Sequence, residues 1–108
     1  MAVVTEREIS TVCDAIVRAF KPERVILFGS HAAGAASAHS DVDLLVVMSF
    51  EGSAIEKGLE VIEAIRPRIP LDLIVRRPDD LRRRLALHDF FLTQAVRGGR
   101  VLYESSRG

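Results

Sequence analysis

The sequence predicts an α/β fold, a small mixed sheet of about four strands with helices packed against it. Stretches with apolar residues at helical spacing alternate along the chain with short apolar runs that end at turn-forming residues. No internal repeat or linker interrupts this alternation. An alternating order favours one sheet covered by helices, and 108 residues leave no room for a second core. We therefore expect a single domain over residues 1–108.

The chain opens with a predicted amphipathic helix. Residues 5–8 (TERE) have the capping-box pattern, and apolar residues follow at spacings of three and four, so we expect the helix to end before Pro22. Cys13, the only cysteine, lies on the apolar face and is expected to be a small core residue. The run at 24–28 (RVILF) then predicts a buried strand that ends at a glycine–serine turn.

A segment of small residues precedes the second predicted strand. Residues 31–40 (HAAGAASAHS) contain too few large apolar side chains for a core element, so we expect a turn of helix and then a loop. The strand at 41–48 (DVDLLVVM) is hydrophobic except at its start, where Asp41 and Asp43 stand two positions apart. Because side chains alternate along a strand, both carboxylates face the same side.

The next helix and strand are predicted between residues 53 and 75. Residues 53–56 (SAIE) repeat the capping-box pattern, and Pro67 marks the end of the helix. We expect four residues to form its apolar face: Ile55, Leu59, Ile62 and Ile65. The strand that follows, 70–75 (PLDLIV), is apolar except for Asp72.

Helical spacing continues from Asp79 until Gly98-Gly99 stop it, as one helix or a broken pair. His88 falls on its apolar stripe, where we expect a packed, hydrogen-bonded side chain. Residues 100–103 (RVLY) can add a short last strand.

Composition argues against several classes of function. Lysine and arginine balance aspartate and glutamate at 15 each, so no direct nucleic-acid binding is expected. No apolar run approaches the roughly 20 residues that a membrane span needs, and the N-terminus has no signal-peptide pattern. A reducing cytoplasm is the expected location.

Three aspartates point to a metal site. Asp41 and Asp43 share a face, and a strand–helix–strand connection can place Asp72 beside them. Carboxylates brought together repel one another and resist desolvation, and a divalent cation relieves both costs. Oxygen ligands without cysteine or histidine in register favour Mg²⁺ over zinc.

The Gly29-Ser30 turn supplies the other half of a candidate site. Glycine lets the backbone approach an anion closely, and the serine hydroxyl can donate to a phosphate. Either motif alone is common in turns and caps. Their combination, with ten residues between Gly29-Ser30 and the Asp41-x-Asp43 pair, favours phosphoryl or nucleotidyl transfer.

These motifs resemble the DNA polymerase β-like nucleotidyltransferase superfamily. The resemblance lies in FGS (28–30), SDVDLLVV (40–47) and LDLIV (71–75). The short chain is similar to the minimal nucleotidyltransferases, and VRGGRVLYE (96–104) resembles their usual ending. The resemblance implies one nucleotidyltransferase domain over residues 1–108.

The resemblance also implies roles for five residues. Asp41 and Asp43 would bind two Mg²⁺ ions, and Asp72 would complete one metal site and help to activate the attacking hydroxyl. Gly29 and Ser30 would cradle the triphosphate of ATP. Larger members bind base and acceptor with extra domains, so we expect a partner to complete this site.

Such proteins are similar to antitoxins that silence a HEPN-domain ribonuclease toxin by transferring AMP to one of its tyrosines. The implied partner is that toxin, in a hetero-oligomer. One position departs from the pattern, because Ala33 replaces a common arginine. Two alternatives therefore stay open: a non-catalytic antitoxin or binding subunit that acts by contact, and a subunit of a small-molecule (antibiotic) nucleotidyltransferase.

Three further features have both a structural and a functional interpretation. Five arginines lie within nine positions: Arg76, Arg77, Arg82, Arg83 and Arg84. A solvated face is favoured for them, and if one acts in the site we expect Arg76 or Arg77, which are close in sequence to Asp72. His31 can donate to a phosphate or be an idle surface residue. Of the adjacent pair at 90–91 (FF), one is a candidate partner contact.

Overall fold

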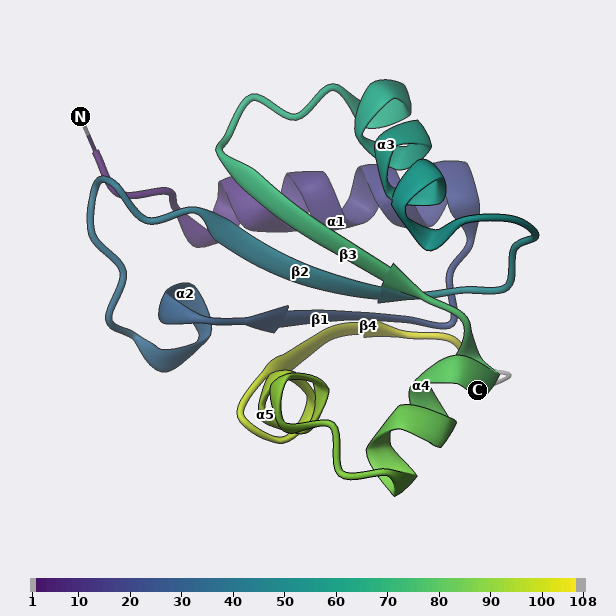
Figure 1. Cartoon of the computed structure of the whole chain (residues 1–108). Helices are drawn as coiled ribbons and strands as arrows, with labels where there is room; N and C mark the ends of the chain where they lie inside the picture. Colours follow the sequence, from purple (N-terminus) through teal and green to yellow (C-terminus); the bar gives the residue numbers. More distant parts are fainter. Residues whose placement is uncertain (1, 107–108) are drawn as a thin grey trace.

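The computed structural model describes residues 2–106, which form a mixed sheet with helices on both faces (Figure 1). The elements are α1 (Glu6–Phe20), β1 (Arg24–Phe28), α2 (Ser30–Ala33), β2 (Val42–Val47), α3 (Ala54–Ile65), β3 (Leu71–Arg76), α4 (Pro78–Ala86), α5 (Phe90–Arg97) and β4 (Arg100–Glu104). The strand order is β3-β2-β1-β4, with β2 and β3 parallel and the other neighbours antiparallel. The predicted α/β fold is confirmed.

The first helix forms as its sequence predicts. Thr5 accepts a hydrogen bond from the Glu8 amide, and the Glu8 carboxylate accepts one from the Thr5 amide, which completes the capping box. The helix ends at Phe20, and its C-cap residue Lys21 takes a left-handed conformation (φ 50°) just before Pro22. Cys13 is buried, as expected.

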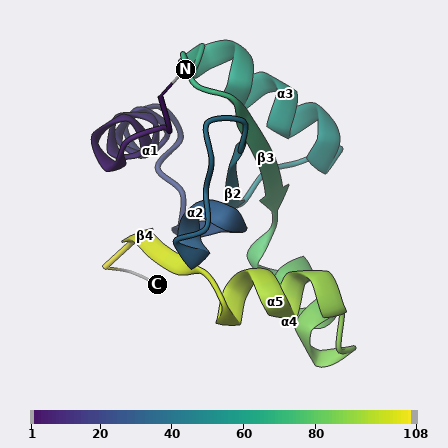
Figure 2. The ribbon, with the colours of Figure 1, turned by 90° about the vertical axis from the view of Figure 1, so that its left-hand side faces the viewer.

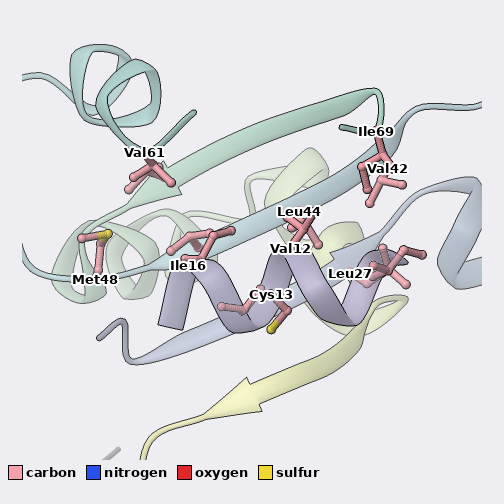
Figure 3. Close-up of a cluster of buried hydrophobic side chains, with 13 residues drawn as sticks. Val12, Cys13, Ile16, Leu27, Val42, Leu44, Met48, Val61 and Ile69 are labelled. Atoms are coloured by element: carbon pink, nitrogen blue, oxygen red, sulfur yellow. The ribbon is translucent and has the colours of Figure 1, made fainter. Parts of the chain in front are cut away.

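Two helical layers enclose the sheet, with α1 and α3 on one face and α4 and α5 on the other (Figures 1 and 2). Leu44 and Val46 of β2 join the core beneath α1 and α3, where Val12, Cys13 and Ile16 also pack (Figure 3). Leu45 and Val47 point to the opposite face and pack with residues of α4 and α5. Because β2 is covered on both faces, its hydrophobic run is nearly continuous.

Helix α3 buries a different stripe from the one its periodicity predicts. Val61 is fully buried, whereas Ile55 and Leu59 are 78% and 66% exposed. The helix lies over β3, the edge strand, and its Gly58 lies against Val75. A helix at the edge of a sheet contacts it along a narrow stripe, so the prediction for Ile55 and Leu59 was wrong.

The last helical segment is a broken pair. Helix α5 begins anew because the Asp89 carboxylate accepts a hydrogen bond from the Leu92 amide (2.9 Å). His88 lies in the turn between the two helices with a left-handed backbone (φ 61°) and an exposed side chain. The expectation that it packs in the core was wrong, since the new helix cap interrupts the stripe. Within residues 2–106, no helix is long and apolar enough to cross a membrane.

Candidate functional site

The C-terminal end of β1 and the N-terminal ends of β2 and β3 lie next to one another at one end of the strands, on the left in Figure 1. In the register of these strands, Asp43 is the neighbour of Phe28 on one side and of Asp72 on the other. Asp41 lies one residue before β2 begins. The topology therefore brings the three aspartates to the strand end that leads into Gly29.

The Asp43 carboxylate lies on the sheet face covered by α4 and α5, the face to which Leu45 also points. It is half-buried, whereas Asp41 and Asp72 are exposed. Burial raises the pKa of Asp43, and the negative charges of Asp72 and Asp41 raise it further, while His31 acts in the opposite direction. The ionised form of this carboxyl is thus less favourable than that of an ordinary exposed aspartate, and a nearby cation would favour it.

These carboxylates have no partner among the described residues. Within residues 2–106, none of Asp41, Asp43 and Asp72 accepts a hydrogen bond or forms an ion pair through its side chain. The Nε2 atom of His31, whose charge acts on Asp43, lies 3.3 Å from the Ser40 carbonyl oxygen. The oxygens of these three carboxylates are therefore not engaged by other side chains and can accept from a ligand or coordinate one.

The donor set suits a hard divalent cation. Carboxylate oxygens are the ligands that Mg²⁺ prefers, and no cysteine competes at this edge. Within the described part of the chain, no three histidine, cysteine, aspartate or glutamate side chains are gathered closely enough to hold one ion as they stand. Asp43 is the central member of the three: it is paired with Asp72 in the strand register, and the charges of Asp72 and Asp41 both act on its pKa.

Gly29 lies directly against the Asp43 side chain. Its backbone (φ 75°, ψ −155°) is one that essentially only glycine adopts. A Cβ added here would overlap the Asp43 Oδ2 atom. Gly29 caps the short helix α2, since its carbonyl accepts from the amides of Ala32 and Ala33, and Ser30 begins that helix. The Ser30 hydroxyl has no hydrogen-bond partner within residues 2–106.

The arginines do not join the acids. Arg76 is four residues from Asp72 along β3, roughly 13 Å at about 3.3 Å per residue, and its Nε lies 3.8 Å from Asp80. Arg77 donates to the Gly52 carbonyl (3.4 Å) and lies over the Phe50 ring, with 5.2 Å from its Cζ to the centroid. Arg76 and Arg77, the two arginines named as candidates if any arginine acts in the site, therefore lie at the opposite end of the strands from the acids.

A pocket beside the acids could not be foreseen from the sequence. A cavity of about 350 Å³ lies between α2 and α5, with Phe28, Gly29, Ala33, Phe91 and Gln94 in its walls. The one hint of it in the sequence was the adjacent pair of phenylalanines, Phe90 and Phe91, in α5.

The structure distinguishes these two phenylalanines. Phe91 is 51% exposed and packs edge-on against Phe28, with ring centroids 5.7 Å apart and an interplanar angle of 88°. Phe90 is 77% exposed and does not line the cavity. Phe91 is therefore the member of the pair that lies beside the site.

The sheet and its helices resemble those of solved nucleotidyltransferase-like structures. A Sulfolobus solfataricus protein assigned as a nucleotidyltransferase superposes with a TM-score of 0.66 and 19% identity, over 94% of this chain and 82% of that one. A toxin–antitoxin structure with AMP-PNP gives a TM-score of 0.54 and 21% identity, over 91% and 75% of the two chains. At these identities the likeness concerns the fold.

A third similar structure is a mutant of the toxin–antitoxin MntA–HpeT, with two aspartate-to-glutamate substitutions two residues apart. It superposes with a TM-score of 0.54 and 20% identity, over 96% of this chain and 77% of that chain. No curated protein sequence matches the chain. The family model described as Polymerase beta, Nucleotidyltransferase matches residues 11–108. By this match over most of its length, the chain belongs to the polymerase β nucleotidyltransferase family.

Proposed function

We propose that this protein is a Mg²⁺-dependent nucleotidyltransferase that transfers AMP from ATP to a hydroxyl, that of a tyrosine, on a HEPN-domain toxin, and thereby acts as its antitoxin. The observation that supports this most directly is the placement of Asp41, Asp43 and Asp72 at neighbouring strand ends, with Asp43 against Gly29 and no lysine or arginine of residues 2–106 paired with them. Such a cluster is costly unless a ligand uses it.

In this proposal the three aspartates have different roles. Asp41, Asp43 and Asp72 would hold Mg²⁺ through their carboxylates, and two bound ions would supply positive charge that neutralises the phosphates. Asp72 orients the attacking hydroxyl and accepts its proton. The acceptor oxygen forms a bond to the α-phosphorus, the bond from that phosphorus to the bridging oxygen breaks, and pyrophosphate leaves.

The phosphate cradle acts beside the acids. Gly29 permits the triphosphate to approach the backbone, and the free Ser30 hydroxyl donates to one of its oxygens. Because Asp43 must be ionised to bind metal and its pKa is raised, we expect protons to compete with Mg²⁺ as the pH falls.

A toxin as partner is supported by the similar structures, two of which are of toxin–antitoxin systems. The substituted aspartates of one of them have the same spacing as Asp41 and Asp43 here. A second candidate, an antitoxin that acts by contact alone, is favoured by one observation: apart from His31, no cationic side chain within residues 2–106 interacts with the acid cluster.

The test combines transfer with neutralisation. The purified chain is incubated with its co-encoded toxin, Mg²⁺ and ATP labelled in the adenylate moiety, and the wild type is compared with Asp43→Asn. We expect labelling of the toxin at a tyrosine by the wild type only, together with loss of ribonuclease activity. Comparable labelling of unrelated proteins or aminoglycosides would contradict the antitoxin role. Neutralisation by Asp43→Asn as complete as by the wild type would identify the contact mechanism instead.

A further inference from the structure

We propose that the cavity between α2 and α5 binds the nucleobase of the nucleotide, and that Phe91 and Gln94 make the site selective for adenine. This inference rests on the proposed function, since it assigns the base of the same nucleotide whose triphosphate lies at Gly29 and Ser30.

The position of the cavity links it to the phosphate cradle. Gly29 is part of its wall and also lies against the Asp43 carboxylate. A ligand can therefore extend from the acids over Gly29 into the cavity without leaving the surface. Its volume of about 350 Å³ is at the lower end of the roughly 300–1,000 Å³ that small-molecule pockets span.

The walls of the cavity suit a flat aromatic ring and do not suit phosphate. Phe28 and Phe91 contribute aromatic surface, and Gly29, Ala33 and Ala95 are too small to fill the space. None of the lining residues is charged. A triphosphate would need cations here, whereas a base gains from stacking on an aromatic side chain.

Gln94 supplies the one side chain in the lining with both a donor and an acceptor. Its carboxamide makes no hydrogen bond within residues 2–106, although its backbone carbonyl accepts from the Gly98 amide (2.8 Å) and so secures the end of α5. An amide can pair with the amino group and a ring nitrogen of adenine at once, but guanine presents two acceptors along the equivalent edge. Gln94 therefore favours ATP over GTP.

Ala33 determines how much room is left. It forms part of the α2 side of the cavity, and its methyl group reaches only a short way from the helix. A longer side chain at this position would occupy space that we assign to the base.

The experiment uses calorimetric titration of the full chain with Mg²⁺ and three probes: ATP, GTP and inorganic tripolyphosphate. We expect Phe91→Ala to weaken ATP binding roughly 5- to 150-fold and to leave tripolyphosphate binding unchanged. Gln94→Ala should lower an ATP-over-GTP preference of about tenfold toward one. Phe90→Ala is the matched control, because Phe90 has the same chemistry on the same helix but lies outside the cavity, and it should bind as the wild type does.

Three results would overturn the inference. Equal losses for ATP and tripolyphosphate in Phe91→Ala, an effect of Phe90→Ala as large as that of Phe91→Ala, or an unchanged nucleotide preference in Gln94→Ala would each remove the base from this cavity. If wild type binds neither ATP nor tripolyphosphate with Mg²⁺, the proposed function fails and this inference fails with it. Should Phe91→Ala not fold, Phe91→Leu keeps most of the volume without the ring and decides in its place.

Discussion

Two clusters of charged side chains lie at the two ends of β3, and they differ in their counter-charges and in the direction of the pKa shift of the central aspartate. At the start of β3, Asp72 is grouped with Asp41 and Asp43, and no cation within residues 2–106 contacts them. Just beyond its end, Asp80 lies 3.8 Å or less from three arginines: Arg76, Arg83 and Arg84. The pKa of Asp43 is raised, by burial first and by its acidic neighbours second. The pKa of Asp80 is lowered: burial acts to raise it, but the hydrogen bond from Arg83 and the arginine charges outweigh burial.

Under the proposed function, the Asp80 cluster contributes to stability and the Asp43 cluster binds a ligand. Around Asp80 the protein supplies its own counter-charges, so the cluster is complete without any other molecule. Around Asp43 it supplies two further carboxylates and, in opposition, only His31, an arrangement that is costly for folding but suits a cation.

The largest effect is expected from Asp43→Asn. The substitution keeps the shape and removes the central carboxylate, so transfer of AMP should fall by several orders of magnitude as a metal ligand is lost. Without metal, the variant should be as stable as the wild type or more so, because a disfavoured charge is gone. Thermal unfolding in EDTA and in Mg²⁺-ATP, beside a transfer assay, measures both effects.

The pH dependence gives the control for this variant. A raised pKa means that the ionised Asp43 destabilises the native state above that pKa, and that the penalty fades as the pH falls toward the ordinary value near 3.8. The stability advantage of Asp43→Asn should therefore be full at neutral pH and disappear in acid. A variant less stable than wild type in EDTA at neutral pH, with a wild type indifferent to Mg²⁺-ATP, would contradict a ligand-binding role for Asp43.

The next largest effect is expected from Gly29→Ala. Alanine is strained at this φ and ψ, which should cost about 1–3 kcal/mol of unfolding free energy, and its Cβ must displace the Asp43 carboxylate. Mg²⁺-ATP should then no longer raise the melting temperature. Gly34→Ala is the matched control: its φ is also positive (74°), but a Cβ there meets nothing within 4 Å. It should cost about 1–2 kcal/mol and leave the response to Mg²⁺-ATP intact. Equal responses in the two variants would argue against the close packing of Gly29 on Asp43 as a requirement.

A smaller change follows from Ser30→Ala. The hydroxyl makes no hydrogen bond with residues 2–106, so folding should be nearly unaffected. Loss of a charge-assisted bond to phosphate should weaken ATP binding by about 1–3 kcal/mol. Calorimetric titration with Mg²⁺-ATP decides the point, and an unchanged affinity would remove Ser30 from the site.

The smallest effect is expected on the opposite side of the comparison, in Asp80→Asn. The outer ends of its arginine partners are exposed and screened, so the loss of stability should be about 1 kcal/mol or less, without effect on AMP transfer. A lowered pKa gives stability that is present above the ordinary value near 3.8 and is lost as the pH falls through the lower, folded-state value. Urea unfolding of wild type and variant should thus differ at pH 7 and converge in strong acid. A marked loss of transfer would show that the two clusters are coupled.

The sequence was sufficient for the sheet and for the meeting of the acids, because strand polarity and side-chain alternation place Asp43 and Asp72 without knowledge of packing. It was insufficient for α3, where periodicity shows that an apolar face exists but not which part of it touches an edge strand; Ile55 and Leu59 are exposed for this reason. His88 fits the helical spacing, but the cap at Asp89 begins a new helix, so His88 lies in the turn and not on the buried stripe. The cavity depends on Phe28 and Phe91 meeting across 63 positions of sequence, which local patterns do not encode.

The Cys13 thiol can report local unfolding in which α1 separates from the sheet. Burial, and secondly the charge of Asp14, raises the pKa of the Cys13 thiol to about 11, so almost none of the reactive thiolate exists at neutral pH. The sulfur lies under α1 and is the only one of its kind in the chain. A maleimide can react with the Cys13 thiol only after α1 has moved away from the sheet. The labelling rate therefore reports how often α1 opens, and a ligand that suppresses this opening should slow the labelling of Cys13.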